Sequence, residues 1–94
     1  MLMMPVHPGR ILVREMKARG LSSLALALKL RVPANRISEI VGEKRGITPE
    51  TALRLGRFFR TGSEFWAQLQ THYELAKTEQ ELGDTIRREV EEAA

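Results

Sequence analysis

The chain has 94 residues, enough for one domain with a modest hydrophobic core but too few for two domains. It contains no cysteine, which excludes a disulfide framework and thiolate chemistry, and its net charge is only +3. The apolar runs are too short to span a membrane and the chain does not start like a signal peptide, so we expect a soluble, cytoplasmic protein.

The first predicted helix begins near His7 and Pro8, because proline is favoured in the first turn of a helix. It runs to about Arg19, where Gly20 ends it. Ser22 then provides the N-cap of a second helix. These short, clearly bounded segments predict an all-helical protein.

Residues 22–42 carry the pattern of a helix-turn-helix, the motif whose second helix enters the major groove of DNA. Apolar or small residues fall where the two helices would meet, at Leu26, Ala27, Leu30, Val32, Ile37 and Ile40. Ala27 is small where two crossing helices approach closely. The second helix of the motif is expected from about Ala34 to Gly42.

A fourth helix follows a charged loop. Thr48 is its predicted N-cap, Pro49 its first residue and Glu50 an acidic residue in its first turn. A fifth helix starts at about Ser63, and its apolar face consists of Phe65, Trp66, Leu69, Tyr73 and Ala76.

Residues 77–94 differ in composition from the rest of the chain. Thr78 and Glu81 have the spacing of a capping box, which predicts a new helix start. A narrow apolar stripe, interrupted by Gly83, then recurs every four residues at Leu82, Ile86 and Val90. We therefore expect a DNA-binding domain over residues 1–76, followed by a charged amphipathic helix or frayed tail over residues 77–94.

The outward-facing residues of the motif have side chains suited to reading bases. An asparagine can bond adenine through both amide atoms, a glutamate can accept from the cytosine amino group, and an alanine can pack on a thymine methyl. The predicted base contacts are Pro33, Ala34, Asn35, Arg36, Ser38 and Glu39. The alternative is a merely solvated helix face, but the apolar frame sets the orientation of this helix and favours base contact.

The distribution of charge along the chain also favours DNA binding by the first 60 residues. Residues 1–60 carry twelve Lys or Arg against four Glu, a net charge of +8, whereas residues 61–94 carry three against eight Asp or Glu, a net charge of −5. A basic front half favours a phosphate-bearing partner. The predicted phosphate contacts are Ser22, Ser23, Arg31, Lys44 and Arg45.

At this level of detail the chain resembles the HigA group of antitoxins, within the lambda-repressor-like (Xre) helix-turn-helix superfamily. The resemblance covers roughly residues 7–76. The segments that carry it are His-Pro-Gly at 7–9, Arg-Ile-Ser-Glu-Ile at 36–40, Lys-Arg-Gly-Ile-Thr at 44–48, Thr-Ala-Leu-Arg-Leu at 51–55 and Glu-Phe-Trp-Ala-Gln-Leu-Gln at 64–70.

Three residues depart from the superfamily pattern. Ser23 stands where a glutamine usually contacts a phosphate, Arg31 replaces the common turn glycine, and Pro33 replaces a serine or threonine cap. The first departure weakens one expected DNA contact. The second requires a non-glycine residue to hold the turn conformation.

The resemblance implies an all-α, five-helix lambda-repressor-like DNA-binding bundle with an additional C-terminal helix. It also implies a homodimeric antitoxin that represses its own operon and silences a HigB-like toxin, an mRNA endonuclease. Two-fold symmetry would place the two recognition helices about 34 Å apart, one turn of DNA.

Two apolar surfaces compete for the dimer interface. The first is the face of the fifth helix, formed by Phe65, Trp66, Leu69 and Tyr73. The second is the terminal stripe at Leu82, Ile86 and Val90. We favour the first surface, because aromatic side chains contribute more on burial.

No catalytic, cofactor or metal site is predicted. His7 and His72 are isolated from cysteine and from each other, and no phosphate-binding glycine loop or nucleophile motif occurs. We therefore expect no enzyme. Two alternatives to the antitoxin stay open at this point: a stand-alone Xre-type regulator without a toxin, and a protein-interaction module that has lost DNA binding.

Overall fold

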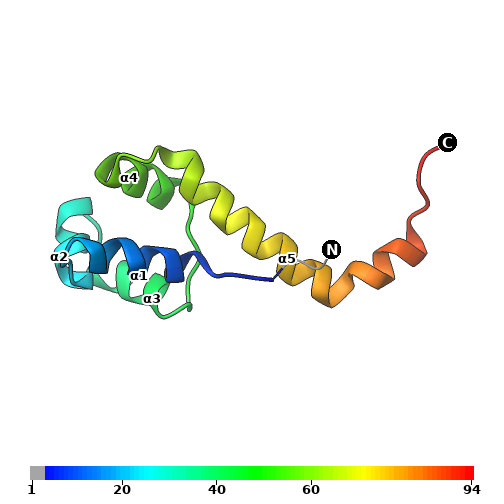
Figure 1. The fold of residues 1–94 in the computed structure, drawn as a ribbon, viewed down its shortest axis with the longest axis horizontal. Coiled ribbons are helices and arrows are strands. Elements are labelled where there is room, and N and C mark those ends of the chain that lie inside the picture. Colours follow the sequence, from blue (N-terminus) through cyan, green and yellow to red (C-terminus); the bar gives the residue numbers. More distant parts are fainter. Residues whose placement is uncertain (1–3) are drawn as a thin grey trace.

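The computed structural model describes residues 4–94, and this part of the chain is α-helical apart from its connections and its two ends. Five helices follow one another in the chain (Figure 1): α1 (Pro8–Ala18), α2 (Ser23–Leu30), α3 (Ala34–Val41), α4 (Pro49–Phe59) and α5 (Ser63–Glu89). The predicted all-α, five-helix architecture is confirmed.

The predicted starts of α1 to α5 are also confirmed. The side chains of Ser22 and Thr48 each accept a hydrogen bond from a backbone N–H three residues later, as N-caps do. Pro8 and Pro49 occupy the first positions of α1 and α4. Gly20, with φ of 64°, follows the end of α1 in the left-handed conformation that favours glycine.

One hydrophobic core joins all five helices. Its fully inaccessible large side chains come from every helix: Leu12, Leu26, Ile37, Ile40, Leu55 and Trp66. Helices α1 to α4 and the first half of α5 pack around this core at one end of the molecule (Figure 1). The core therefore fixes α3 relative to every other helix.

The last helix is longer than expected. It passes without a break through Thr78 and Glu81, so the capping-box prediction is wrong and no new helix starts there. Gly83 does not interrupt the helix either, and the carboxylate of Glu79 covers it. The additional C-terminal helix is thus the distal half of α5, and the expected boundary between residues 76 and 77 lies inside this helix.

The distal half of α5 projects away from the body and changes direction along its length, which gives the molecule an extent of 51 × 23 × 22 Å (Figure 1). Local ion pairs of Arg87 with Glu79 and Asp84 support it. Within residues 4–94, no helix is long and apolar enough to cross a membrane.

Candidate nucleic-acid interface

The frame of the helix-turn-helix is built as the sequence predicts. Ala27 is 1% exposed and lets α2 and α3 approach closely, while the N–H of Val32 donates to the carbonyl oxygen of Ala27 across the turn at 3.1 Å. Arg31 ends α2 with φ of 61° and ψ of 45°, so a non-glycine residue holds the left-handed turn position. Ile37 and Ile40 then anchor α3 in the core with no exposed surface.

Four of the predicted base-contact residues form the exposed outer face of the α3 N-terminal half. They are Pro33, Ala34, Asn35 and Ser38. Pro33 precedes the helix without a side-chain cap, and the hydroxyl of Ser38 donates to the carbonyl oxygen of Asn35 at 3.3 Å. Among the described residues, no hydrogen bond engages the Asn35 amide, which leaves both its donor and its acceptor available to a ligand.

Arg36 faces α4 instead of joining this exposed set. Its guanidinium lies 3.1 Å from a carboxylate oxygen of Glu50, the acidic residue in the first turn of α4. Arg54 binds the other oxygen of Glu50 and also donates to the carbonyl oxygen of Leu30 at 2.9 Å. The hydrogen bond from Arg54 and the charge of Arg36 hold the pKa of Glu50 below its usual value. The structure thus places Arg36 in a bridge between α3 and α4, and the predicted base contact would have to share its guanidinium with Glu50.

Glu39 and Arg45 were predicted to contact a base and a phosphate respectively, but the structure brings them together. Their carboxylate and guanidinium atoms lie 2.7 Å apart, and each side chain is about two-fifths exposed. This pair connects the loop after α3 to α3 itself. A base contact by Glu39 would therefore use a carboxylate that is already paired with Arg45. A phosphate contact by Arg45 would likewise use a guanidinium that is already paired with Glu39.

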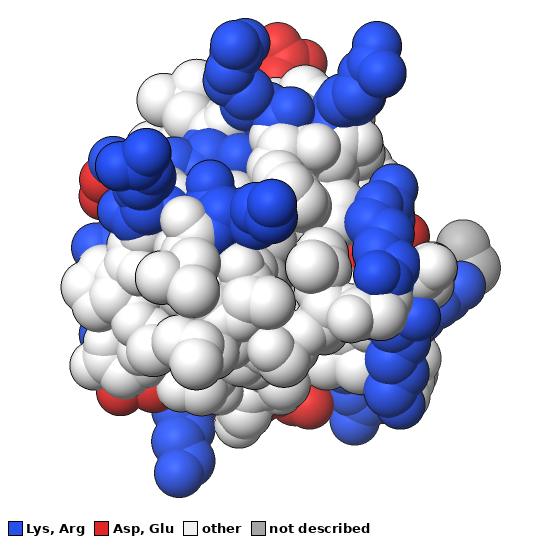
Figure 2. Space-filling model, turned by 90° about the vertical axis from the view of Figure 1, so that its left-hand side faces the viewer, with Lys and Arg blue, Asp and Glu red and all other residues white. Residues whose placement is uncertain are grey.

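The remaining phosphate candidates border the α3 surface. Ser22 is exposed, and its oxygen accepts from the Ala25 N–H at 3.1 Å, which leaves its hydroxyl proton free to donate. Ser23 is partly exposed, whereas Arg31 and Lys44 are exposed. Figure 2 shows the end of the molecule where α2 and α4 lie, on which Lys and Arg are the main charged side chains and acidic side chains appear mainly at the margins. This distribution favours an anionic partner.

The His-Pro-Gly segment holds the start of α1 against the end of α3. His7 is 4% exposed, and its Nδ1 accepts the Gly9 N–H at 2.9 Å as the N-cap of α1. A Cβ at Gly9 would overlap the carbonyl oxygen of Ile40, so only glycine permits this approach. Burial lowers the pKa of His7; the charge of Glu43 and a hydrogen bond to the Arg45 backbone oppose that shift, and the charge of Lys77 adds to it.

Gln70 in α5 is a positioning residue that we did not predict. Its Oε1 accepts the backbone N–H of Ile47 at 2.8 Å, and its amide group occupies the space that a side chain at Gly46 would need. The loop after α3 is thereby tied to α5. Gln70 belongs to the Glu-Phe-Trp-Ala-Gln-Leu-Gln segment that carries the family resemblance. Its place in this segment was the only sign in the sequence that it has a structural role.

The expected dimer face on α5 mostly faces its own core. Trp66 is fully buried and its Nε1 donates to the Thr61 hydroxyl at 2.9 Å, so it is a core residue and not part of a dimer surface. Leu69 packs against the core, and the Tyr73 ring meets the edge of His7 with 4.9 Å between ring centroids. Only Phe65 of the four is well exposed, at 42%.

The exposed apolar side chains of α5 form a different stripe. Its members recur at helical spacing along the outer face and are between 42% and 56% exposed: Phe65, Leu75, Leu82 and Ile86. Val90 follows the helix in an extended conformation and is 65% exposed. A second protein surface is needed to remove this stripe from water.

Comparison with known proteins identifies close relatives, although no protein-family model matches the chain. Virulence-associated protein I of Dichelobacter nodosus is 51% identical over 77 residues, covering 81% of this chain and 71% of that protein. An addiction module antidote protein of the HigA family from Coxiella burnetii has a TM-score of 0.93 at 40% identity, covering 97% of this chain and all of that one. Pseudomonas aeruginosa antitoxin HigA, solved with the higBA promoter, has a TM-score of 0.92 at 41% identity with the same coverage.

Proposed function

The chain belongs to the HigA family of helix-turn-helix antitoxins, and on this basis we propose that it binds operator DNA as a homodimer, represses its own operon and neutralises a HigB-like toxin. The observation that carries the DNA-binding part is the exposed outer face of α3. There, Asn35 has a free amide, and the buried residues Ile37 and Ile40 fix the orientation of the helix.

The α3 surface is suited to direct readout in the major groove. Asn35 would donate to and accept from one adenine, while the Ala34 methyl packs on a neighbouring thymine methyl. Pro33 and Ser38 complete the contact surface on either side. Glu39 stays within reach of a base edge, and its ion pair with Arg45 orients its carboxylate at the end of the surface.

Phosphate contacts would flank the base contacts on both sides. Ser22 and Ser23 present hydroxyl and backbone N–H groups at the start of α2, where the helix dipole favours an anion. Lys44 and Arg45 lie in the loop after α3, which Gln70 and Glu39 hold in place. Arg31 extends from the turn. These contacts position the protein on DNA and supply the salt-sensitive part of its affinity.

The dimer surface is the outer stripe of α5, in place of the inner face that the sequence favoured. An isologous two-fold contact through Phe65, Leu75, Leu82 and Ile86 would bury the same apolar patch of both subunits. It would also leave both α3 helices free to read successive major-groove segments. Leu82 and Ile86 lie in the distal half of α5, which has few buried contacts with the rest of its own chain. The dimer contact would therefore stabilise this half of the helix.

Toxin neutralisation rests on family membership alone. A second candidate, a regulator without a toxin, shares all the DNA-binding chemistry and differs only in that partner. Coexpression with a toxin-like reading frame beside the gene separates the two: an antitoxin restores growth and copurifies with the toxin, whereas a stand-alone regulator does neither.

The DNA-binding part is tested by mobility shift on the protein's own promoter, with a shuffled fragment of equal length as competitor. We expect the promoter to be bound at least a hundredfold more tightly than the shuffled fragment. The double variant Asn35→Ala/Ser38→Ala should lose most of this preference, whereas Gln80→Ala, an exposed position on α5, should keep it. Equal affinity of the wild-type chain for both fragments would contradict the proposal.

A further inference from the structure

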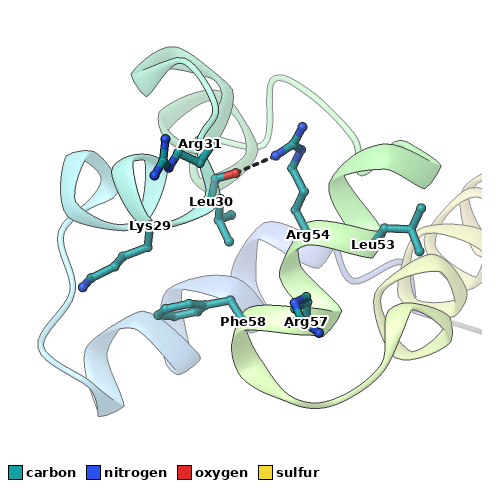
Figure 3. A pocket seen from close by; sticks show the side chains of 7 residues that line it. All are labelled: Lys29, Leu30, Arg31, Leu53, Arg54, Arg57 and Phe58. Atoms are coloured by element: carbon teal, nitrogen blue, oxygen red, sulfur yellow. Dashed lines mark hydrogen bonds between the residues drawn. The ribbon is translucent and has the colours of Figure 1, made fainter.

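A groove between α2 and α4 lies apart from the base-reading surface and from the outer stripe of α5, and Arg31 is the one lining residue that is also a proposed phosphate contact. It encloses about 370 Å³ and is shown in Figure 3. Two apolar side chains from α4, Leu53 and Phe58, line it, and Leu53 is 63% exposed. Exposed apolar surface of this kind next to a concavity is typical of a binding site.

Four cationic side chains surround this apolar surface: Lys29, Arg31, Arg54 and Arg57. Within residues 4–94, no carboxylate lies within ion-pair distance of Lys29, Arg31 or Arg57. Arg54 is fixed from both sides, by Glu50 and by the carbonyl oxygen of Leu30. The groove therefore suits a segment that presents an apolar anchor among carboxylates.

The end of the same chain has this chemistry. Glu89 is the last residue of α5, and the extended Val90 is 65% exposed and is followed by Glu91 and Glu92. Three carboxylates thus flank one apolar side chain. The segment lies beyond the apolar stripe of α5, so both surfaces can be occupied at the same time.

The tail cannot reach the groove of its own chain. The groove lies at the end of the molecule formed by α2 and α4, whereas α5 carries residues 89–92 to the opposite end (Figure 1). The longest dimension of the molecule, 51 Å, separates these two ends. Any contact between them joins two copies.

We propose that residues 89–92 of one copy dock into the α2–α4 groove of another copy, with Val90 against Leu53 and Phe58 and the glutamates beside the cationic side chains. The contact joins two different surfaces of the chain, so it can link copies in series. Its exposed ion pairs are individually weak and are screened by salt. The contact therefore matters where copies are already held close together, as on neighbouring DNA sites.

Disulfide trapping detects such a weak contact, since the chain has no cysteine of its own. Two full-length single-cysteine variants, Leu53→Cys and Val90→Cys, are mixed and oxidised with diamide at low salt. We expect the mixed disulfide to form at least tenfold faster than when Leu53→Cys is replaced by Ala18→Cys, an exposed control position on α1. Raising the salt to 0.5 M should remove most of this difference. Equal rates for the two mixtures would overturn the proposal.

Charge exchange tests the partner assignment independently of the cysteines' own effect on folding. Arg57→Glu in the groove copy should slow trapping about tenfold, because it makes the groove less positive. Glu91→Lys/Glu92→Lys in the tail copy should slow trapping as well, because the reversed tail is repelled by Lys29 and Arg31. The matched charge change Arg14→Glu on α1 should leave the trapping rate unchanged. Trapping at the unmodified rate in either charge-reversed mixture would contradict the pairing of these two segments.

Binding to one isolated operator site separates this inference from the proposed function. Arg57→Glu should bind such a site as the wild-type chain does, because the contact is between copies. A large loss of single-site affinity would assign the groove to DNA phosphate and overturn the proposal. Normal trapping in a chain that binds no DNA would leave the inference standing and remove the proposed function.

Discussion

The helix-turn-helix body and the distal half of α5 are held in shape by different interactions. In the body, six large side chains from five helices are completely inaccessible to solvent. They pack in one core that joins segments far apart in the chain. Beyond Ala76, the only buried residue of α5 is Gly83, and the side-chain ion pairs are local to the helix. A lone helix with such support is marginal in water. The body therefore stands alone, whereas the distal half requires a partner surface.

The contrast predicts losses of stability of very different size for two neighbouring residues. Trp66→Ala should lower the free energy of unfolding by about 3–5 kcal/mol, because it empties a fully buried site in the body. Phe65→Ala, one residue away on the outer face, should cost about 1 kcal/mol in the dilute monomer. Urea unfolding measures both values. Similar losses of unfolding free energy in the two variants would contradict the assignment of Trp66 to the core and of Phe65 to the outer face.

The dimer proposal is tested on the distal half. Ile86→Glu should raise the dimer dissociation constant at least about a hundredfold, equivalent to about 2.8 kcal/mol, because it places a charge in the apolar stripe. Gln80→Glu adds the same charge on α5 at an exposed polar position and should leave the dimer intact. Sedimentation equilibrium at micromolar concentration gives both constants. An Ile86→Glu chain that stays dimeric would place the interface elsewhere.

The phosphate contacts belong to the body and should act on all DNA sequences alike. Lys44→Ala should make the slope of log affinity against log salt shallower by about 0.9. Arg45→Ala should change it less, because the Arg45 guanidinium is already paired with Glu39. Arg14→Ala is the control, since it removes an exposed charge from α1. An unchanged slope in a Lys44→Ala/Arg45→Ala chain would remove this loop from the interface.

The smallest expected effect concerns pH and the His-Pro-Gly segment. Burial holds the pKa of His7 below its ordinary value of 6.5, and the neutral ring caps α1. The stabilisation is therefore fully present above pH 6.5 and is lost as the pH falls toward the folded-state pKa, by at most about 1.4 kcal/mol per pH unit.

Asn is a good N-cap without a titrating side chain, so His7→Asn should remove this part of the pH dependence. Urea unfolding of both chains between about pH 8 and pH 5 measures it. Parallel pH profiles would exclude His7 as the group responsible.

The sequence predicted the body almost to the residue because its signals are local. Caps such as Ser22 and Thr48 mark helix starts, and the spacing of Ile37 and Ile40 marks a buried face. The same reasoning was wrong for Thr78, because a capping-box spacing inside a helix has no meaning once the preceding turn is already helical.

Pairings between distant polar residues were not predictable. Whether Arg36 faces DNA or Glu50, and whether Glu39 meets Arg45, depends on where α4 and the loop lie in space. Likewise, the spacing of Phe65, Trp66, Leu69 and Tyr73 shows that they are apolar, but only packing against the body shows that three of them face inward.

The central claim is that the exposed face of α3 reads base pairs through Asn35. The most direct test measures the affinity of the wild-type and Asn35→Ala chains for the operator and for every single base-pair variant of one half-site. We expect Asn35→Ala to lose about 1–3 kcal/mol on the native operator and to lose discrimination at one A·T pair only. An Asn35→Ala chain with the affinity and base preferences of the wild type would contradict this assignment of the recognition surface.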